Sequence, residues 1–313
     1  MALITINLDF RKYRDHHALV EDLSPVFSAT MLDEVYVTID LQTDSNMLYS
    51  DHLLMVVAAL HFLRSNSIPV TGIIKANPDD HKIKYASRVN FFKEVGFEFD
   101  EKFQRHDATG RFTEIRSYTR MDIYALFTEI NKILYANTTI SIDVLQLFYY
   151  CLYEIMDNVL EHSAITTGWV CAQYFEANAE IRLIICDTGQ GIHRSLVSNP
   201  EYQELNEEQA LNKCIHRGVT KGNGLGFGLF ATSEFVKANH GDLMIYSGGH
   251  FLIMNDKNIQ VNSGSPWNGT LVFLRINTNI PVNYKDIMPN DHALPDDYQE
   301  FVEKHFGISN ELW

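Results

Sequence analysis

The sequence predicts an α+β fold, in which a small α/β domain is followed by an α/β sandwich with a mixed sheet covered by helices. In the first 105 residues, strand-like and helix-like segments alternate, which is typical of parallel β-α-β units. A long helix signal at 141–162 is followed by two β-rich segments that can pair. The chain of 313 residues is long enough for two hydrophobic cores.

The first domain is assigned to residues 1–105. Its strand signals are alternating β-branched runs, and its helix signals are apolar residues at helical spacing. Ser50 is the expected N-cap of the first helix, and Gly96 is a typical helix stop. The expected elements are strands at 35–41 and 68–74, helices at 51–64 and 83–95, and a short strand at 97–99.

A polar stretch at 104–110 predicts a linker, assigned to residues 106–120. The second domain is assigned to 121–280, where Ser141 is the expected N-cap of the longest helix. Residues 281–313 form a polar tail with a short helix at 298–305. In the second domain we expect helices at 121–136, 141–162, 207–215 and 229–239, strands at 169–175, 181–186, 242–247 and 270–276, and between the last two a hairpin at 251–254 and a polar loop to 268.

Composition narrows the class of protein. The formal net charge of -15 repels phosphate backbones, so we expect no nucleic-acid partner. No basic start precedes an apolar run, and the longest apolar stretch, 53–63, is too short to cross a bilayer, so we expect neither a signal peptide nor a membrane partner. The four cysteines form no C-x-x-C pair, which disfavours a zinc knuckle and favours buried thiols in a cytoplasmic protein.

The helix at 141–162 carries a polar stripe beside an apolar face. Glu154, Asn158 and His162 are spaced by four residues and therefore project from one side of the helix. A carbonyl oxygen such as that of Asn158 can be a ligand of Mg²⁺, which prefers oxygen. Glu154 is placed to orient or deprotonate an attacking water or hydroxyl. The alternative interpretation is a solvated charged face.

Two glycine-containing motifs follow. Asp187 ends a buried strand, where its carboxylate can accept a hydrogen bond from a purine amine, and the glycines after it allow a close turn. Alternate glycines then open a helix whose free N–H groups suit an anion, with Lys221 and Arg217 adding positive charge. A plain turn and a flexible hinge are the alternatives. The candidate binding residues in these motifs are Asp187, Gly189, Gly191, Ile192, Lys221, Gly222, Gly224, Gly226, Gly228 and Leu229.

In their order and spacing, the three motifs resemble the N, G1 and G2 boxes of the GHKL ATPase and kinase superfamily, over about residues 120–278. The resemblance implies a Bergerat-type sandwich that binds ATP and Mg²⁺. It implies that Asn158 holds Mg²⁺, that Asp187 binds the adenine N6 and that His162 lies near the phosphates. Thr270, after Gly269 at the start of a strand, corresponds to a threonine near the adenine. Residues 193–221 correspond to the ATP lid.

The first domain resembles a STAS domain, the anti-sigma-antagonist fold. The resemblance is carried by Asp40-Leu41, by the helix that opens near Ser50, and by the segment 88–97. At the helix start, residues 49–52 read Tyr-Ser-Asp-His, in place of the Asp-Ser-Ser-Gly that is phosphorylated in that family.

These resemblances imply an ATPase or a serine/threonine protein kinase of the anti-sigma type, coupled to a regulatory domain. The protein partner would be a STAS-like protein or the chain's own first domain, and many relatives form homodimers. The alternative is a non-catalytic module in which ATP gates a protein interaction. A sensor histidine kinase is disfavoured because the helix at 121–136 contains no histidine, and the acidic charge disfavours a topoisomerase-type ATPase.

Overall fold

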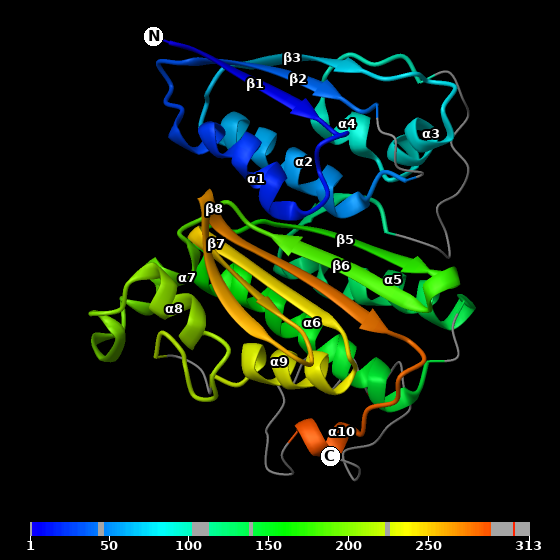
Figure 1. The fold of residues 1–313 in the computed structure, drawn as a ribbon, viewed down its shortest axis with the longest axis vertical. Helices are drawn as coiled ribbons and strands as arrows, with labels where there is room; N and C mark the ends of the chain where they lie inside the picture. The colour runs from blue at the N-terminus through cyan, green and yellow to red at the C-terminus, as the bar shows by residue number, and fades with distance from the viewer. Residues whose placement is uncertain are drawn as a thin grey trace.

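The chain folds into four layers, as seen in a computed structural model that describes residues 2–42, 47–101, 113–137, 140–222, 226–288 and 303. A three-stranded sheet forms the first layer, and helices α1 and α2 lie under it (Figure 1). A five-stranded sheet is the third layer, and helices α5, α6 and α9 cover its other face (Figure 1). An α+β fold with an N-terminal α/β domain and a second α/β sandwich is therefore confirmed.

The N-terminal sheet consists of β1 (Leu3–Asp9), β2 (Glu34–Asp40) and β3 (Val70–Lys75), which pair in parallel in that order. The crossovers are α1 (His16–Leu23), with the 3-10 helix η1 (Ser24–Ser28), and α2 (Ser50–Ser65). Consecutive right-handed crossovers in one direction place both helices on the same face of the sheet. The first strand and helix, β1 and α1, were not predicted, although Ile4, Ile6 and Leu8 alternate as in a strand.

The amphipathic segment at 83–95 is divided into two helices, so the prediction of one continuous helix is wrong. These are α3 (His81–Arg88) and α4 (Phe91–Val95). Asn90 between them has a φ of 70°, a left-handed conformation that a continuous α-helix cannot contain. Residues 97–99 form no strand, and α2 begins at Ser50 with Tyr49 as its N-cap, one residue earlier than predicted.

The second sheet has the order β4-β5-β6-β8-β7, and all of its pairings are antiparallel, so the prediction of a mixed sheet needs this correction. Residues 116–118 belong to this sheet, although the sequence analysis assigned them to the linker. The polar residues 104–110, on which the linker prediction was based, lie outside the described residues. The strands are β4 (Arg116–Tyr118), β5 (Gly168–Phe175), β6 (Glu180–Cys186), β7 (Asp242–Met254) and β8 (Ile259–Asn277).

Helix α6 (Ile142–His162) matches its prediction closely, and Ser141 caps it by accepting a hydrogen bond from the Val144 N–H at 3.4 Å. The other helices are α5 (Ile123–Asn137), α7 (Gly191–Leu196), α8 (Glu207–Lys213), α9 (Gly228–Ala238) and α10 (Tyr284–Ile287), with 3-10 turns η2 (Arg120–Asp122), η3 (Glu176–Asn178) and η4 (Pro200–Tyr202). Helix α7 was not predicted. The predicted tail helix at 298–305 lies outside the described residues, apart from Glu303.

Strands β7 and β8 form one long hairpin, so the short hairpin at 251–254 and the polar loop to 268 are wrong predictions. The Asn255 N–H donates to the Asn258 carbonyl at 3.0 Å and closes the turn. Residues 259–263 and Trp267 pair with β7 because the ladder uses backbone groups, which a hydrophobicity pattern does not detect.

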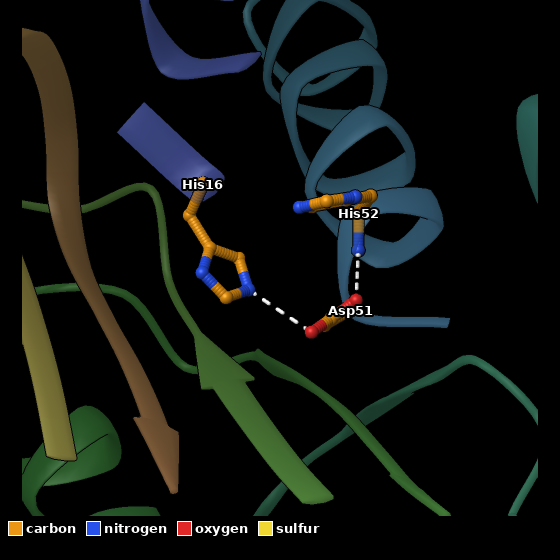
Figure 2. A group of neighbouring side chains, drawn as sticks. All are labelled: His16, Asp51 and His52. Carbon is orange, nitrogen blue, oxygen red and sulfur yellow. Dashed lines mark hydrogen bonds and ion pairs between the residues drawn. The ribbon is translucent and has the colours of Figure 1, made fainter. Parts of the chain in front are cut away.

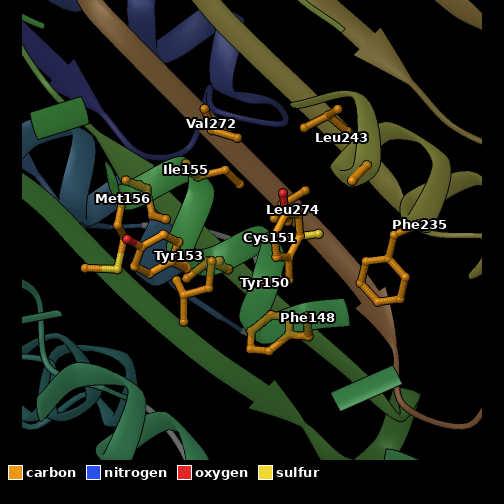
Figure 3. Close-up of a cluster of buried hydrophobic side chains, with 14 of the residues drawn as sticks. Phe148, Tyr150, Cys151, Tyr153, Ile155, Met156, Phe235, Leu243, Val272 and Leu274 are labelled. Atoms are coloured by element: carbon orange, nitrogen blue, oxygen red, sulfur yellow. The ribbon is translucent and has the colours of Figure 1, made fainter. Parts of the chain in front are cut away.

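The five-stranded sheet is buried on both faces, because neighbouring residues of its strands enter different cores. Along β6, Leu183 and Ile185 pack with α6 and α9, in the core that Figure 3 shows. Ile184 and Cys186 face the opposite way, into a core shared with the N-terminal domain. Helix α2 lies between the two sheets, and for that reason residues 50–60 are all buried.

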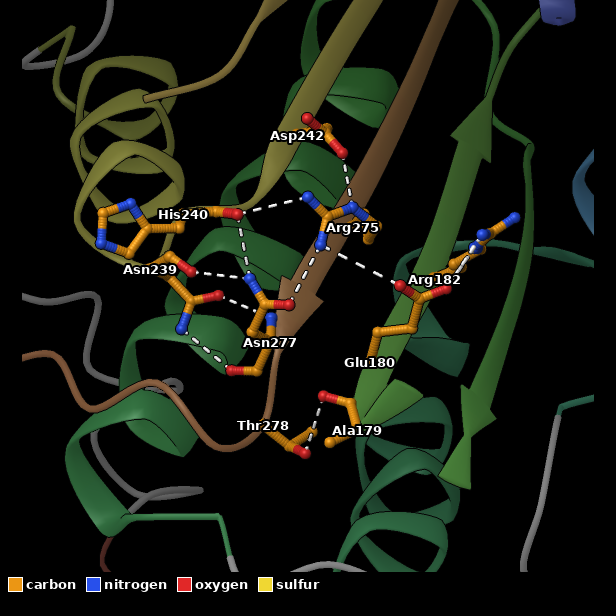
Figure 4. Close-up of polar contacts among 9 residues, drawn as sticks. All are labelled: Ala179, Glu180, Arg182, Asn239, His240, Asp242, Arg275, Asn277 and Thr278. Atoms are coloured by element: carbon orange, nitrogen blue, oxygen red, sulfur yellow. Dashed lines mark hydrogen bonds and ion pairs between the residues drawn. The ribbon is translucent and has the colours of Figure 1, made fainter. Parts of the chain in front are cut away.

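A polar network joins the residues after α9 to the neighbouring strands of the sheet (Figure 4). The Asn239 side chain after α9 donates to the Asn277 carbonyl at 2.9 Å, and the Asn277 backbone N–H donates to the Asn239 Oδ1 at 2.6 Å. Arg275 links Asp242 and Glu180 on the neighbouring strands. The network anchors the C-terminal end of α9, whose N-terminal end borders the site described next.

Candidate functional site

A cavity of about 410 Å³ lies between α6, the start of α9, the segment 191–221 and the five-stranded sheet. Of the predicted site residues, Glu154, Asn158, His162, Asp187, Gly191, Ile192, Lys221, Gly226, Gly228, Leu229 and Thr270 line it. Gly189 and Gly222 do not, and Gly224 lies outside the described residues. The three motifs, far apart in sequence, therefore meet at one cavity.

Glu154 on α6 is held between two neighbours. Its carboxylate packs directly against Gly228, where a Cβ would lie 2.1 Å from the Glu154 Oε2. Tyr150, one turn earlier, hydrogen-bonds to the same carboxylate. Burial raises the pKa of Glu154 to about 7, and the hydrogen bond from Tyr150 only partly offsets this. A carboxylate with this pKa can take up and release a proton near neutral pH.

The raised pKa of Glu154 makes a prediction for stability. Below about pH 4 the Glu154 carboxyl is neutral in both the folded and the unfolded protein, whereas above pH 7 the folded protein holds a buried charge at Glu154. The stabilisation from the neutral carboxyl is therefore lost as the pH rises through 7. Glu154→Gln keeps an acceptor for Tyr150 and should stabilise the protein at pH 8 by on the order of 1–3 kcal/mol.

Thermal unfolding of wild type and Glu154→Gln at pH 4.5 and pH 8 measures this. We expect a melting temperature a few degrees higher for the variant at pH 8, and a smaller difference at pH 4.5. Equal differences at both pH values would contradict the proposed burial of a charge at Glu154.

His162 and Asn158 lie further along the same face of α6, and both are half-buried in the cavity wall. The His162 Nδ1 is buried and has no hydrogen-bond partner among the described residues. Burial, reinforced by the nearby Lys221, lowers the pKa of His162. An unpaired polar atom at a cavity wall can bind a polar ligand there.

Asp187 is buried at the end of β6, and both of its oxygens accept backbone hydrogen bonds. The Gly189 N–H donates at 2.8 Å and the Thr270 N–H at 3.2 Å. Burial raises the pKa of Asp187 to about 7, although both hydrogen bonds favour the ionised form. A carboxylate fixed in this way presents an acceptor to the cavity in a defined orientation.

The two glycines after Asp187 have different roles. Gly189 does not line the cavity, because it packs on the end of α6, where a Cβ would lie 2.0 Å from the Ser163 carbonyl oxygen. Gly191 has a φ of 77° and lies against Ser247. Ser247 accepts from the Ile192 N–H and donates to the Gly269 carbonyl, both at 2.9 Å. Ser247 was missed by sequence reasoning, because it lies on β7, outside any motif.

The segment 193–221 closes one side of the cavity and is anchored to α6. The Lys221 Nζ donates to the Glu161 carbonyl at 2.5 Å, at the end of that helix. The Gly218 N–H donates to the Gly226 carbonyl at 2.8 Å, which ties this segment to the residues just before α9. Arg217 does not line the cavity, and its guanidinium lies 5.7 Å from the centre of the Phe227 ring.

Most of the apolar cavity wall was not predicted. Sequence reasoning treated these residues as core positions or gave them no role, although Ile155, Val159 and Phe227 stand inside the motifs. They are Tyr150, Tyr153, Ile155, Val159, Leu196, Val219, Phe227, Ile245 and Val272. An apolar wall with a few fixed polar groups is typical of a small-molecule binding site.

The fold and the site together resemble a nucleotide-binding α/β sandwich of the GHKL class. Residues 143–277 match the family described as histidine kinase-, DNA gyrase B-, and HSP90-like ATPase. This match supports the GHKL assignment of the segment and ATP binding by it. No curated protein matches the chain. In the part of the chain that the structure describes, no helix has the length and apolarity to span a bilayer.

Proposed function

We propose that the protein binds ATP with Mg²⁺ in this cavity and uses it either for hydrolysis or for phosphorylation of a protein serine or threonine. The observation that carries the proposal is that Glu154, with a pKa near 7, lines the same cavity as Asp187 and the start of α9. A proton acceptor, an adenine acceptor and an anion-binding helix start are the parts that such a reaction needs.

Each group has a proposed task. Asp187 would accept a hydrogen bond from the adenine amine, next to the apolar wall. The free N–H groups at the start of α9, with Lys221 and His162, would bind the phosphates. The Asn158 carbonyl oxygen fits Mg²⁺, which would neutralise phosphate charge when bound. Glu154 would take the proton of the attacking water or hydroxyl.

Gly228→Ala tests whether the position of Glu154 matters for turnover. The new Cβ would lie 2.1 Å from the Glu154 Oε2, so the carboxylate must move. We expect ATP turnover to fall by about 10- to 100-fold, because small displacements of a catalytic group are costly. Steady-state phosphate release measures this. Gly249→Ala is the matched control, because its nearest neighbour is 3.4 Å away, and it should keep wild-type turnover.

The N-terminal domain is proposed to act as the STAS-like regulator of this site. Phe27 of η1 packs edge-to-face on Trp267, with ring centres 4.9 Å apart. The Trp267 Nε1 donates to the Asp187 carbonyl at 3.0 Å. A shift of η1 would therefore reach the adenine side of the cavity through one side chain. The protein partner would be this domain or a separate STAS-like protein. The chain would act as a monomer or a homodimer. It would act in the cytoplasm, where buried free thiols such as Cys171 are common.

Incubation of the full chain with γ-labelled ATP, alone and with candidate protein acceptors, distinguishes the reactions. Release of free phosphate by the purified chain indicates a hydrolase. An acid-stable labelled band indicates a serine/threonine kinase. Saturable ATP binding without either product would replace the proposal by its alternative, a non-catalytic module that ATP opens and closes.

A further inference from the structure

A second polar cluster lies at the interface between the two domains, away from the nucleotide cavity. His16 is the first residue of α1, and Asp51 and His52 are in the first turn of α2. Figure 2 shows the three side chains converging from the two helices. The His16 Nε2 lies 3.0 Å from the Asp51 Oδ2, and one ligand atom from each residue lies within 4.8 Å of the other two.

We propose that His16, Asp51 and His52 bind a divalent first-row transition metal, with Zn²⁺ as the reference ion. Two imidazoles and one carboxylate form a mixed nitrogen and oxygen ligand set, which suits Zn²⁺ and its neighbours better than Mg²⁺ or Ca²⁺. Ligand atoms at about 2.1 Å from a tetrahedral ion lie about 3.4 Å apart. The His16–Asp51 separation of 3.0 Å is close to that value and the other separations do not exceed 4.8 Å, so small side-chain adjustments can bring the three ligand atoms around one ion.

The surroundings support a metal at this place. The side chains of His16 and Asp51 are only 12% and 8% exposed, so the ligands are largely shielded from water. The second Asp51 oxygen, Oδ1, accepts from the His52 N–H at 2.8 Å, which orients the carboxylate with Oδ2 toward His16. The nearby cation Arg182 is paired with Glu180 at 2.9 Å. Phe273 of β8 packs on His16, with ring centres 4.7 Å apart, and covers the cluster on the side of the second domain.

Two residues of this cluster lie in the segment 49–52, where the sequence differs from the STAS motif. The expected phosphorylated helix start is replaced by Tyr-Ser-Asp-His at 49–52, and two of these four residues are proposed ligands. The proposal does not depend on the nucleotide site, and every measurement below is made without ATP.

The test is metal binding by the full chain in nucleotide-free buffer. Metal analysis and titration with Zn²⁺ against a chromophoric chelator should give one tight site per chain. The Co²⁺ form should show the visible d–d absorption of an ion with imidazole ligands. His52→Ala and Asp51→Asn should each weaken Zn²⁺ binding by about 100-fold or more, since each removes or weakens one of three ligands.

His17→Ala is the matched control, because His17 is the next residue of α1 but stacks on Phe251 at 4.9 Å, outside the cluster. It should keep wild-type Zn²⁺ affinity. The wild-type titration and the Co²⁺ spectrum need no variant, so they stand even if a variant folds poorly. Absence of a saturable site in the wild type, or equal Zn²⁺ affinity in wild type and His52→Ala, would overturn the proposal.

Discussion

Glu154→Gln is expected to lower ATP turnover by about 100- to 10,000-fold, while ATP affinity changes by no more than a few-fold. The amide keeps the size of the side chain and can accept the Tyr150 hydrogen bond, but it cannot take a proton from the attacking group. The same substitution should stabilise the protein at pH 8, so activity and stability should change in opposite directions. A misfolded variant could not give this combination.

Single-turnover rates and equilibrium ATP binding, measured on the same samples, separate chemistry from binding. Glu161→Gln is the control on the same helix, because the Glu161 carboxylate is 53% exposed and pairs with Arg120. That surface ion pair contributes little, so the control should keep wild-type turnover. Wild-type turnover in Glu154→Gln would remove Glu154 from the mechanism.

Asp187→Asn is expected to weaken ATP binding by about 10- to 100-fold, the value of a hydrogen bond to a charged acceptor. The amide has one acceptor oxygen, whereas the Asp187 carboxylate accepts from both Gly189 and Thr270 and would also have to accept from the adenine. An amide nitrogen directed into the cavity can instead donate to the carbonyl of guanine. The preference for ATP over GTP should therefore fall further than ATP affinity alone.

Equilibrium titrations with ATP and GTP measure this preference, with thermal unfolding as a check that the variant is folded. Asp242→Asn is the control, because Asp242 bonds to Arg275 at the start of β7, outside the cavity lining. It should bind ATP as wild type does. Unchanged ATP affinity and base preference in Asp187→Asn would show that the base is not bound at this carboxylate.

Local signals predicted the site better than they predicted the surroundings of the site. Helix α6 carries a capping serine and strong periodicity, so the common face of Glu154, Asn158 and His162 followed from spacing. The strand before Asp187 and the helix after Gly228 were marked in the same local way. Each of these features depends on residues close in sequence.

The missed features depend on contacts between distant segments. The sequence does not show that Trp267 touches both Phe27 and Asp187, because each of these pairs is separated by dozens of residues. The linker hypothesis treated the two domains as separate, whereas they share a core across the five-stranded sheet. The polar half of β8 was missed because backbone pairing with β7, rather than side-chain burial, makes it a strand.

Calorimetric titration of the full chain with ATP in the presence of Mg²⁺ tests the central claim most directly. We expect one saturable ATP site per chain, weaker binding when Mg²⁺ is removed, and loss of affinity in Asp187→Asn but not in Asp242→Asn. Two results would contradict the assignment of this cavity as a nucleotide site. One is that the wild-type chain binds no ATP, and the other is that Asp187→Asn and Asp242→Asn bind ATP equally well.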